Sequence, residues 1–161
     1  MGARPGGLLV ADAFAEITAS PRRGLPSASI PVLRQVPLFA GLTDRHLRKL
    51  GKLATLTNFS AHVLIVREGT RGDAFFVILD GHAVVVRRDG SKTTLSAGDY
   101  FGEMALLDRR PRSATVMTQT KITTLRISAA EFRALLRRES SIALALLQTL
   151  SSRVRELEQS F

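Results

Sequence analysis

The most informative stretch of this sequence reads Gly98-Asp-Tyr-Phe-Gly-Glu-Met-Ala-Leu-Leu-Asp-Arg-Arg-Pro-Arg-Ser-Ala-Thr-Val116. It lies between two runs typical of β-strands and contains a short helix-compatible piece from Glu103 to Leu107. Gly102 precedes this piece and lets the backbone approach a ligand closely, because glycine has no Cβ. The free N–H groups at the start of a helix bind phosphate, and the guanidinium of Arg112 can hold two phosphate oxygens at once. With the carboxylate of Glu103, which suits a sugar hydroxyl, these residues indicate a sugar-phosphate ligand.

Short β-rich runs surround this stretch on both sides. They fall at residues 63–66, 75–79, 83–86, 93–96, 115–120 and 122–127. Turn signals such as Asp80-Gly81 and Asp89-Gly90 separate them. Short strands at spacings of about ten residues predict an antiparallel sandwich or barrel closed through tight turns. We expect this barrel to occupy residues 54–127.

Helical patterns flank the β-rich region, so the predicted fold class is mainly β with flanking α-helices. Upstream, Thr43 is a suitable N-cap for a helix from Asp44 to Leu56. Downstream, the capping-box pattern from Ser128 to Glu131 opens a helix that ends near Arg138, and a longer helix follows Ser140-Ser141. Residues 1–31, rich in proline and glycine, are predicted to be a tail or linker with one short helix over 8–18.

The last helix carries apolar residues in alternating steps of four and three: Ala143, Leu147, Leu150, Val154, Leu157 and Phe161. This spacing is a heptad seam, which favours pairing with a second copy of the chain. Ile142, Leu144 and Leu146 widen the stripe, which instead favours packing back onto the barrel. The sequence leaves both alternatives open.

The composition excludes several classes of protein. The chain has 161 residues, no cysteine and a formal net charge of +9. Without cysteine there are no disulfides, thiolate zinc sites, iron–sulfur clusters or cysteine nucleophiles. The basic residues are spread along the chain, which favours a diffuse field that attracts small anions over a DNA-binding arm. No stretch reaches about 18 consecutive apolar residues, so we expect no membrane span and a cytoplasmic protein.

Neither a metal site nor a catalytic site is indicated. The three histidines stand one by one, without the spacing of metal ligands: His46, His62 and His82. Four aspartates stand beside glycines and suit turns better than acid–base chemistry: Asp73, Asp80, Asp89 and Asp99. There is no nucleophile elbow and no Ser–His–Asp arrangement, so we predict a binding protein and no enzyme.

The stretch from Gly98 to Val116 resembles the phosphate-binding cassette of the cyclic nucleotide-binding domain family. Members include the regulatory subunits of protein kinase A, cyclic-nucleotide-gated channels and bacterial catabolite activator proteins. The family pattern falls on Phe101, Gly102, Glu103, Ala105, Leu106, Pro111, Arg112, Ala114, Thr115 and Val116. The run from Arg67 to Gly81 resembles the core hairpin of the family. The likeness covers residues 32–161 and implies a jelly roll with N-terminal helices and C-terminal helices of the B and C type.

The resemblance implies a role for each cassette residue. Arg112 would bind the exocyclic oxygens of the cyclic phosphate, and Glu103 the ribose 2′-hydroxyl. The remaining ligand-binding residues would be Gly102, Met104, Ala105, Ser113 and Ala114. Ser113 follows the arginine, and a serine at this position slightly favours cAMP over cGMP. The family caps the base from the last helix or another chain, which makes Thr149, Ser152, Arg153 and Arg155 the candidate caps.

Two features depart from the family pattern. The turn at Ala61-His62 often carries glycine in the family. No helix-turn-helix module follows the last helix, so we expect no DNA binding by this chain alone. The expected function is a sensor module that binds cAMP, or less readily cGMP, moves its C-terminal helices and acts on an effector protein. The alternatives are a docking or dimerisation domain without ligand, and the regulatory part of a DNA-binding transcription regulator.

Overall fold

The computed structural model describes residues 22–23 and 29–160. The predicted helix over 8–18 and most of the predicted tail lie outside the described residues. The strands are β1 (Arg22–Arg23), β2 (Thr55–Phe59), β3 (Leu64–Val66), β4 (Ala74–Asp80), β5 (Ala83–Arg87), β6 (Lys92–Leu95), β7 (Tyr100–Phe101), β8 (Ala114–Thr118) and β9 (Ile122–Ser128). The helices are α2 (Ser29–Arg34), η1 (Pro37–Phe39), α3 (Asp44–Gly51), η2 (Glu103–Leu106), α4 (Ala129–Arg138) and α5 (Ser140–Gln159).

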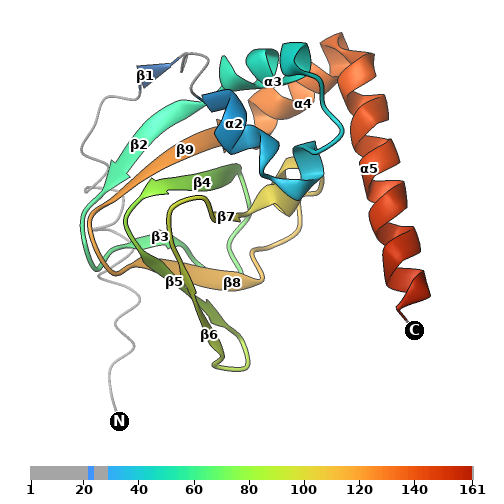
Figure 1. Ribbon diagram of the computed structural model, residues 1–161. Helices are drawn as coiled ribbons and strands as arrows, with labels where there is room; N and C mark the ends of the chain where they lie inside the picture. Colours follow the sequence, from blue (N-terminus) through green and yellow to red (C-terminus); the bar gives the residue numbers. More distant parts are fainter. Residues whose placement is uncertain (1–21, 24–28, 161) are drawn as a thin grey trace.

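The strands of the described residues form two antiparallel sheets, which confirms the predicted fold class. One sheet has the order β1-β2-β9-β4-β7 and the other the order β3-β8-β5-β6. Figure 1 shows the two sheets facing each other, with the helices gathered beyond the first sheet. No strand pairing in the described part of the chain joins one sheet to the other, so the jelly roll is not closed by hydrogen bonds into a barrel.

Strand β4 explains how one sheet supports two cores. Phe75 and Val77 pack into a cluster with the helices, whereas Phe76 and Ile78 pack between the two sheets. Successive side chains of a strand point to opposite faces, so a strand covered on both faces reads as one continuous apolar run. The ring of Phe39 in η1 lies 5.7 Å from the ring of Phe75, which docks the N-terminal helices on this strand.

Some predicted boundaries are wrong. Helix α3 ends at Gly51 rather than at Leu56, because β2 begins at Thr55 and pairs with β9 along its whole length. The polar sequence of β2 and the two residues of β7 carry no strong strand signal. Both become strands by pairing with neighbours distant in the sequence. The capped start of α4 is confirmed, since the Ser128 hydroxyl accepts a hydrogen bond from the backbone N–H of Glu131.

Helix α5 packs on the domain only through its first turns. Ile142 and Leu146 are buried in the core beside η1 and α4. Four apolar side chains of the same helix are more than half exposed: Leu144, Leu147, Val154 and Leu157. Figure 1 shows α5 standing to one side, with its C-terminal end directed away from the other helices. The packing alternative therefore accounts for the start of this helix and leaves three residues of the heptad seam, Leu147, Val154 and Leu157, exposed.

The turn before β3 has the backbone geometry that glycine adopts most easily. His62 has φ 61°, and it alone has a positive φ among the described residues that are not glycine. The left-handed region is sterically unfavourable for a residue with a Cβ. The turn therefore keeps a shape suited to glycine at a position where the family often has that residue.

Candidate functional site

The helical turn of the cassette begins at a left-handed glycine. Gly102 has φ +81° and is the N-cap of η2, which is one short 3₁₀ turn over Glu103–Leu106. A Cβ on Gly102 would lie 2.2 Å from Nη1 of Arg112 and 3.0 Å from the carbonyl oxygen of Ala74. Any side chain here would therefore collide with the guanidinium that is expected to hold the phosphate.

Arg112 is held in place by both its backbone and its side chain. Its N–H donates to the carbonyl of Thr70 (2.7 Å), and its own carbonyl accepts from the N–H of Gly69 (2.8 Å). The side chain is 7% exposed, and Nη2 donates to the carbonyl of Ala74 (2.6 Å). Burial lowers the pKa of Arg112, and the nearby carboxylate of Asp73 partly opposes this effect. A guanidinium has five N–H donors, so donors remain for an anion.

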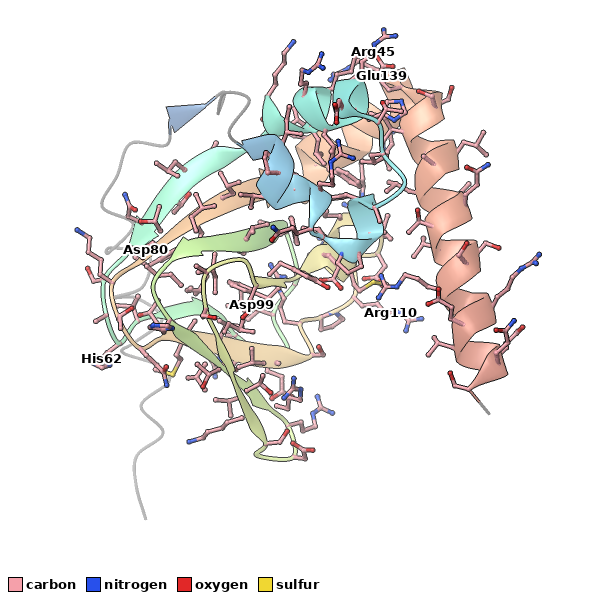
Figure 2. The ribbon with its side chains drawn as sticks, viewed as in Figure 1. Arg45, His62, Asp80, Asp99, Arg110 and Glu139 are labelled. Atoms are coloured by element: carbon pink, nitrogen blue, oxygen red, sulfur yellow. The ribbon has the colours of Figure 1, made fainter. Side chains whose placement is uncertain are left out.

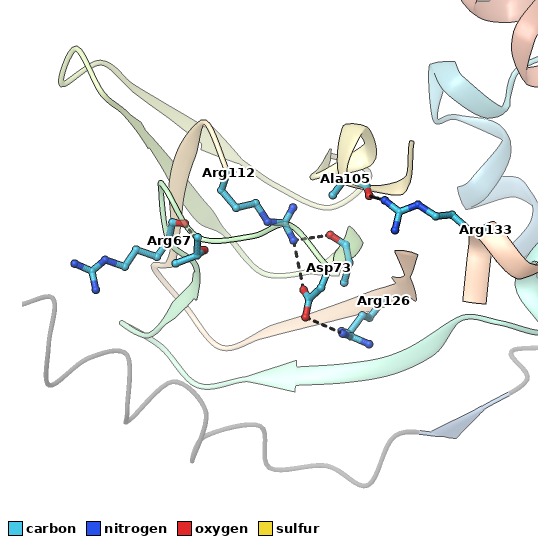
Figure 3. Close-up of polar contacts among 8 residues, drawn as sticks. Arg67, Asp73, Ala105, Arg112, Arg126 and Arg133 are labelled. Carbon is cyan, nitrogen blue, oxygen red and sulfur yellow. Dashed lines mark hydrogen bonds and ion pairs between the residues drawn. The ribbon is translucent and has the colours of Figure 1, made fainter. Parts of the chain in front are cut away.

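Asp73, for which the sequence predicts a turn role, also lies beside the candidate site. Its carboxylate oxygens lie 3.9 Å from Nη2 of Arg112 and 3.9 Å from Nη2 of Arg126 (Figure 3). Asp73, Arg112 and Arg126 are far apart in the chain, so no local pattern links them. The turn roles of Asp89 and Asp99 are confirmed, since their carboxylates accept from the N–H groups of Ser91 and Ser96.

Glu103 stands apart from Arg112. The two side chains form no ion pair in the structure, and the carboxylate close to Arg112 is that of Asp73. Burial raises the pKa of Glu103, against the opposing effects of its own backbone N–H and of Arg153. A partly buried carboxylate without a strong cationic partner is a good acceptor for a neutral donor such as a hydroxyl.

The candidate caps on α5 lie in different surroundings. Arg153 acts electrostatically on both Glu103 and Tyr100, so its charge lies near the cassette. Thr149 faces the turn that follows η1, because its hydroxyl oxygen lies 2.8 Å from where a Cβ on Gly41 would be. Ser152 and Arg155 are exposed. Of these candidates, the structure brings Arg153 towards the cassette and turns Thr149 to the helix interface.

Arg133 connects the cassette to helix α4. Its Nη2 donates to the carbonyl of Ala105 (3.1 Å) and to the carbonyl of Asp108 (3.0 Å), as Figure 3 shows for Ala105. No sequence pattern marks this residue, because an arginine in an amphipathic helix gives no local sign of its partner. The bond ties the end of η2 directly to the helix that leads into α5.

The remaining predicted ligand residues line the same segment with different exposure. Met104 is 50% exposed and Ala105 is buried. Ser113 is exposed, and Ala114 is half-buried at the start of β8. Among the described residues, no group of three or more histidines and carboxylates gathers as a metal site would require. No helix in that part of the chain is both long and apolar enough to cross a membrane.

Known proteins share this sequence pattern and this arrangement. The chain is 34% identical over 106 residues to a cAMP-dependent protein kinase regulatory subunit of Aspergillus fumigatus, covering 65% of this chain and 26% of that protein. It is 36% identical over 96 residues to the cGMP-dependent protein kinase, isozyme 1, of Drosophila melanogaster, covering 55% of this chain and 12% of that protein. The chain thus spans about a quarter of the kinase regulatory subunit that it matches.

A solved structure covers most of the chain, and a family model covers about half of it. The N-terminal domain of a transcriptional regulator from Streptomyces coelicolor A3(2) matches with a TM-score of 0.71 at 26% identity, covering 81% of this chain and 94% of that chain. The model of the cyclic nucleotide-binding domain matches residues 56–139, slightly more than half of the sequence. This range includes strands of both sheets and the cassette residues Gly102, Glu103 and Arg112. Because the family model matches more than half of the sequence, the chain belongs to the cyclic nucleotide-binding domain family.

Proposed function

We propose that this chain is a sensor module that binds cAMP in preference to cGMP and regulates an effector protein. The observation that carries the proposal is the buried guanidinium of Arg112, fixed beside the left-handed Gly102 at the start of η2. A buried cation with free donors next to backbone N–H groups is suited to a small monoanion. Family membership supplies the class of ligand, because this is a regulatory domain family.

Calorimetric titration with cAMP and with cGMP tests this function directly. We expect micromolar or tighter binding of at least one nucleotide, with cAMP the tighter of the two. The preference rests on Ser113, which is exposed beside Arg112, and on the relatives named as cAMP-dependent. A relative named as cGMP-dependent makes cGMP the alternative ligand. No heat and no thermal shift with either nucleotide would instead favour a docking domain that has lost its ligand.

Ligand binding is proposed to move α5 through α4. Arg133 of α4 holds the carbonyls of Ala105 and Asp108, so a displacement of the cassette is transmitted to α4 and the helix that follows it. A ligand shifts such an equilibrium only by its difference in affinity for the two arrangements. The exposed part of α5 is then the surface that a partner would recognise.

We further propose that two copies of the chain pair through α5. Leu147, Val154 and Leu157 lie on the heptad seam and are more than half exposed. Leu147→Glu is expected to convert the dimer to a monomer in sedimentation at micromolar concentration, because a charge at a seam position cannot be buried without a partner. The matched control is Gln148→Glu, one residue away and off the seam, which should leave the dimer intact. A wild-type monomer would contradict the pairing.

A regulatory role in a DNA-binding transcription regulator is the second candidate function. It is favoured by the match over 94% of a domain from a transcriptional regulator. Binding of this chain to duplex DNA with a strong dependence on salt would support it, since phosphate contacts release counterions. We expect no such binding by this chain alone.

Replacing Glu103 with glutamine is expected to weaken nucleotide binding and to stabilise the ligand-free protein. The loss in affinity should be about 10- to 150-fold, which is about 1.5–3 kcal/mol for one charge-assisted hydrogen bond. Because burial raises the pKa of Glu103, the folded state favours the protonated carboxyl. The stability from this group is present in full below its ordinary pKa and is lost as the pH rises through the raised value. Glutamine does not titrate, so E103Q should melt above the wild type at pH 7.

Melting curves between pH 4 and pH 8 measure this effect, and the gain from E103Q should shrink as the pH falls. Glu139→Gln is the matched control of opposite sign, because a hydrogen bond from Lys49 lowers the pKa of Glu139. That variant should melt below the wild type at pH 7, with the difference lost at low pH. If E103Q melts below the wild type at pH 7, the folded state stabilises the ionised carboxylate of Glu103 instead of disfavouring it, and this prediction is contradicted.

A further inference from the structure

Three arginines lie in or beside the cassette, and their side chains take no part in its hydrogen bonds or ion pairs. Arg109 and Arg110 directly precede Pro111 and Arg112, and Arg71 forms an antiparallel bridge with Pro111. All three side chains are exposed. In the part of the chain that the structure describes, none of the three makes a side-chain hydrogen bond or an ion pair. We call these residues, Arg71, Arg109 and Arg110, the arginine rim.

The carboxylates close to the rim have other partners. Asp73 faces Arg112 and Arg126, and Glu68 pairs with Arg88. The carboxylate of Asp108 accepts the backbone N–H of Arg110 (3.2 Å), and among the described residues it is the one acidic side chain that is hydrogen-bonded to the rim. Three positive charges against this single carboxylate leave the rim cationic.

We propose that the arginine rim steers the anionic nucleotide into the site, and that it acts on the rate of association rather than on the bound state. This inference rests on the proposed function, since it concerns the same ligand and the same site. Exposed charges in water bind an ion weakly at contact, but their summed field acts over the distance at which a ligand approaches. Arg112 is buried and acts at contact, whereas the rim remains in solvent and acts before contact.

The expected size of the effect follows from charge and screening. The ligand carries one negative charge, so removing three rim charges should slow association about three- to fivefold at an ionic strength of about 20 mM. The Debye length falls to roughly 4 Å near 0.5 M salt, and the difference should then nearly vanish. Dissociation should stay within about twofold of the wild-type rate, because steering changes encounter rather than release.

The test is stopped-flow association of cAMP that carries a fluorophore at C8 of the adenine, which leaves the ribose 2′-hydroxyl free, with the full chain over a series of salt concentrations. The rim variant is R71Q/R109Q/R110Q. The matched control is R48Q/R137Q/R138Q, which removes three exposed arginines of α3 and α4 and changes the net charge equally. Figure 2 shows Glu139, the residue after Arg138, at the top of the molecule and well separated from Arg110. The control should slow association less than about 1.5-fold.

Each outcome bears on one of the two proposals. Slower association by the rim variant alone, lost at high salt, supports steering. Equal effects of the two variants would show that only net charge matters and would overturn the inference. Faster dissociation that persists at high salt would show that the rim contacts the bound ligand directly, and this result would also overturn the steering proposal. In both cases the proposed function stands, whereas failure of the wild-type protein to bind the probe or unlabelled cAMP would remove that function.

Discussion

Arg112→Ala is expected to weaken the binding of cyclic nucleotide by two to three decades or more, or about 3–5 kcal/mol. The side chain is 7% exposed and donates to the carbonyl of Ala74, so its position is set before any ligand arrives. Removing it takes away the charge that compensates a phosphate in a partly dry site. The carboxylate of Asp73 then remains without this cation and adds repulsion against the anion.

Calorimetry of Arg112→Ala and of Arg112→Lys separates the charge from the geometry. Lysine keeps the charge but lacks the planar fork that holds two phosphate oxygens, so its affinity should lie between wild type and alanine. Melting temperatures of both variants show whether the fold survives. Affinity near that of the wild type in the alanine variant would mean that the phosphate is held elsewhere.

Gly102→Ala should impair both the fold and the site. Its φ of +81° disfavours a residue with a Cβ, and that Cβ would lie 2.2 Å from Nη1 of Arg112 and 3.0 Å from the carbonyl oxygen of Ala74. Strain and displacement together should lower the free energy of unfolding by about 2–4 kcal/mol. Displacing the guanidinium should also reduce nucleotide affinity about 10- to 100-fold, through loss of one charge-assisted hydrogen bond.

Gly90→Ala is the matched control for backbone strain alone. Gly90 has φ +85°, close to that of Gly102, but no heavy atom lies within 4 Å of its added Cβ. This variant should lose about 1–2 kcal/mol of stability and keep its affinity for nucleotide. Chemical denaturation and calorimetry of the two variants measure both effects. Equal losses in affinity would show that the close approach to Arg112 is not what requires glycine at position 102.

Local patterns predicted the elements that carry strong apolar periodicity or capping signals. Strand β4 was found because it is apolar on both faces, and α4 because Ser128 and Glu131 mark its start. Strands β2 and β7 were missed for a different reason. Their residues are polar or few, and pairing with β9 and β4 is what makes them strands. Such pairing depends on segments distant in the sequence, which local propensity does not contain.

The sequence by itself determined the class of fold and the cassette from Gly102 to Arg112, because these depend on residue types at short, regular spacing. Only the tertiary structure decided which charges meet. Asp73, Arg112 and Arg126 come together through the pairing of β4 and β9 and the turn beside them. Arg133 reaches the carbonyls of Ala105 and Asp108 because α4 packs beside η2. Contacts of this kind follow from the packing of two apolar cores, which brings together side chains that no local pattern relates.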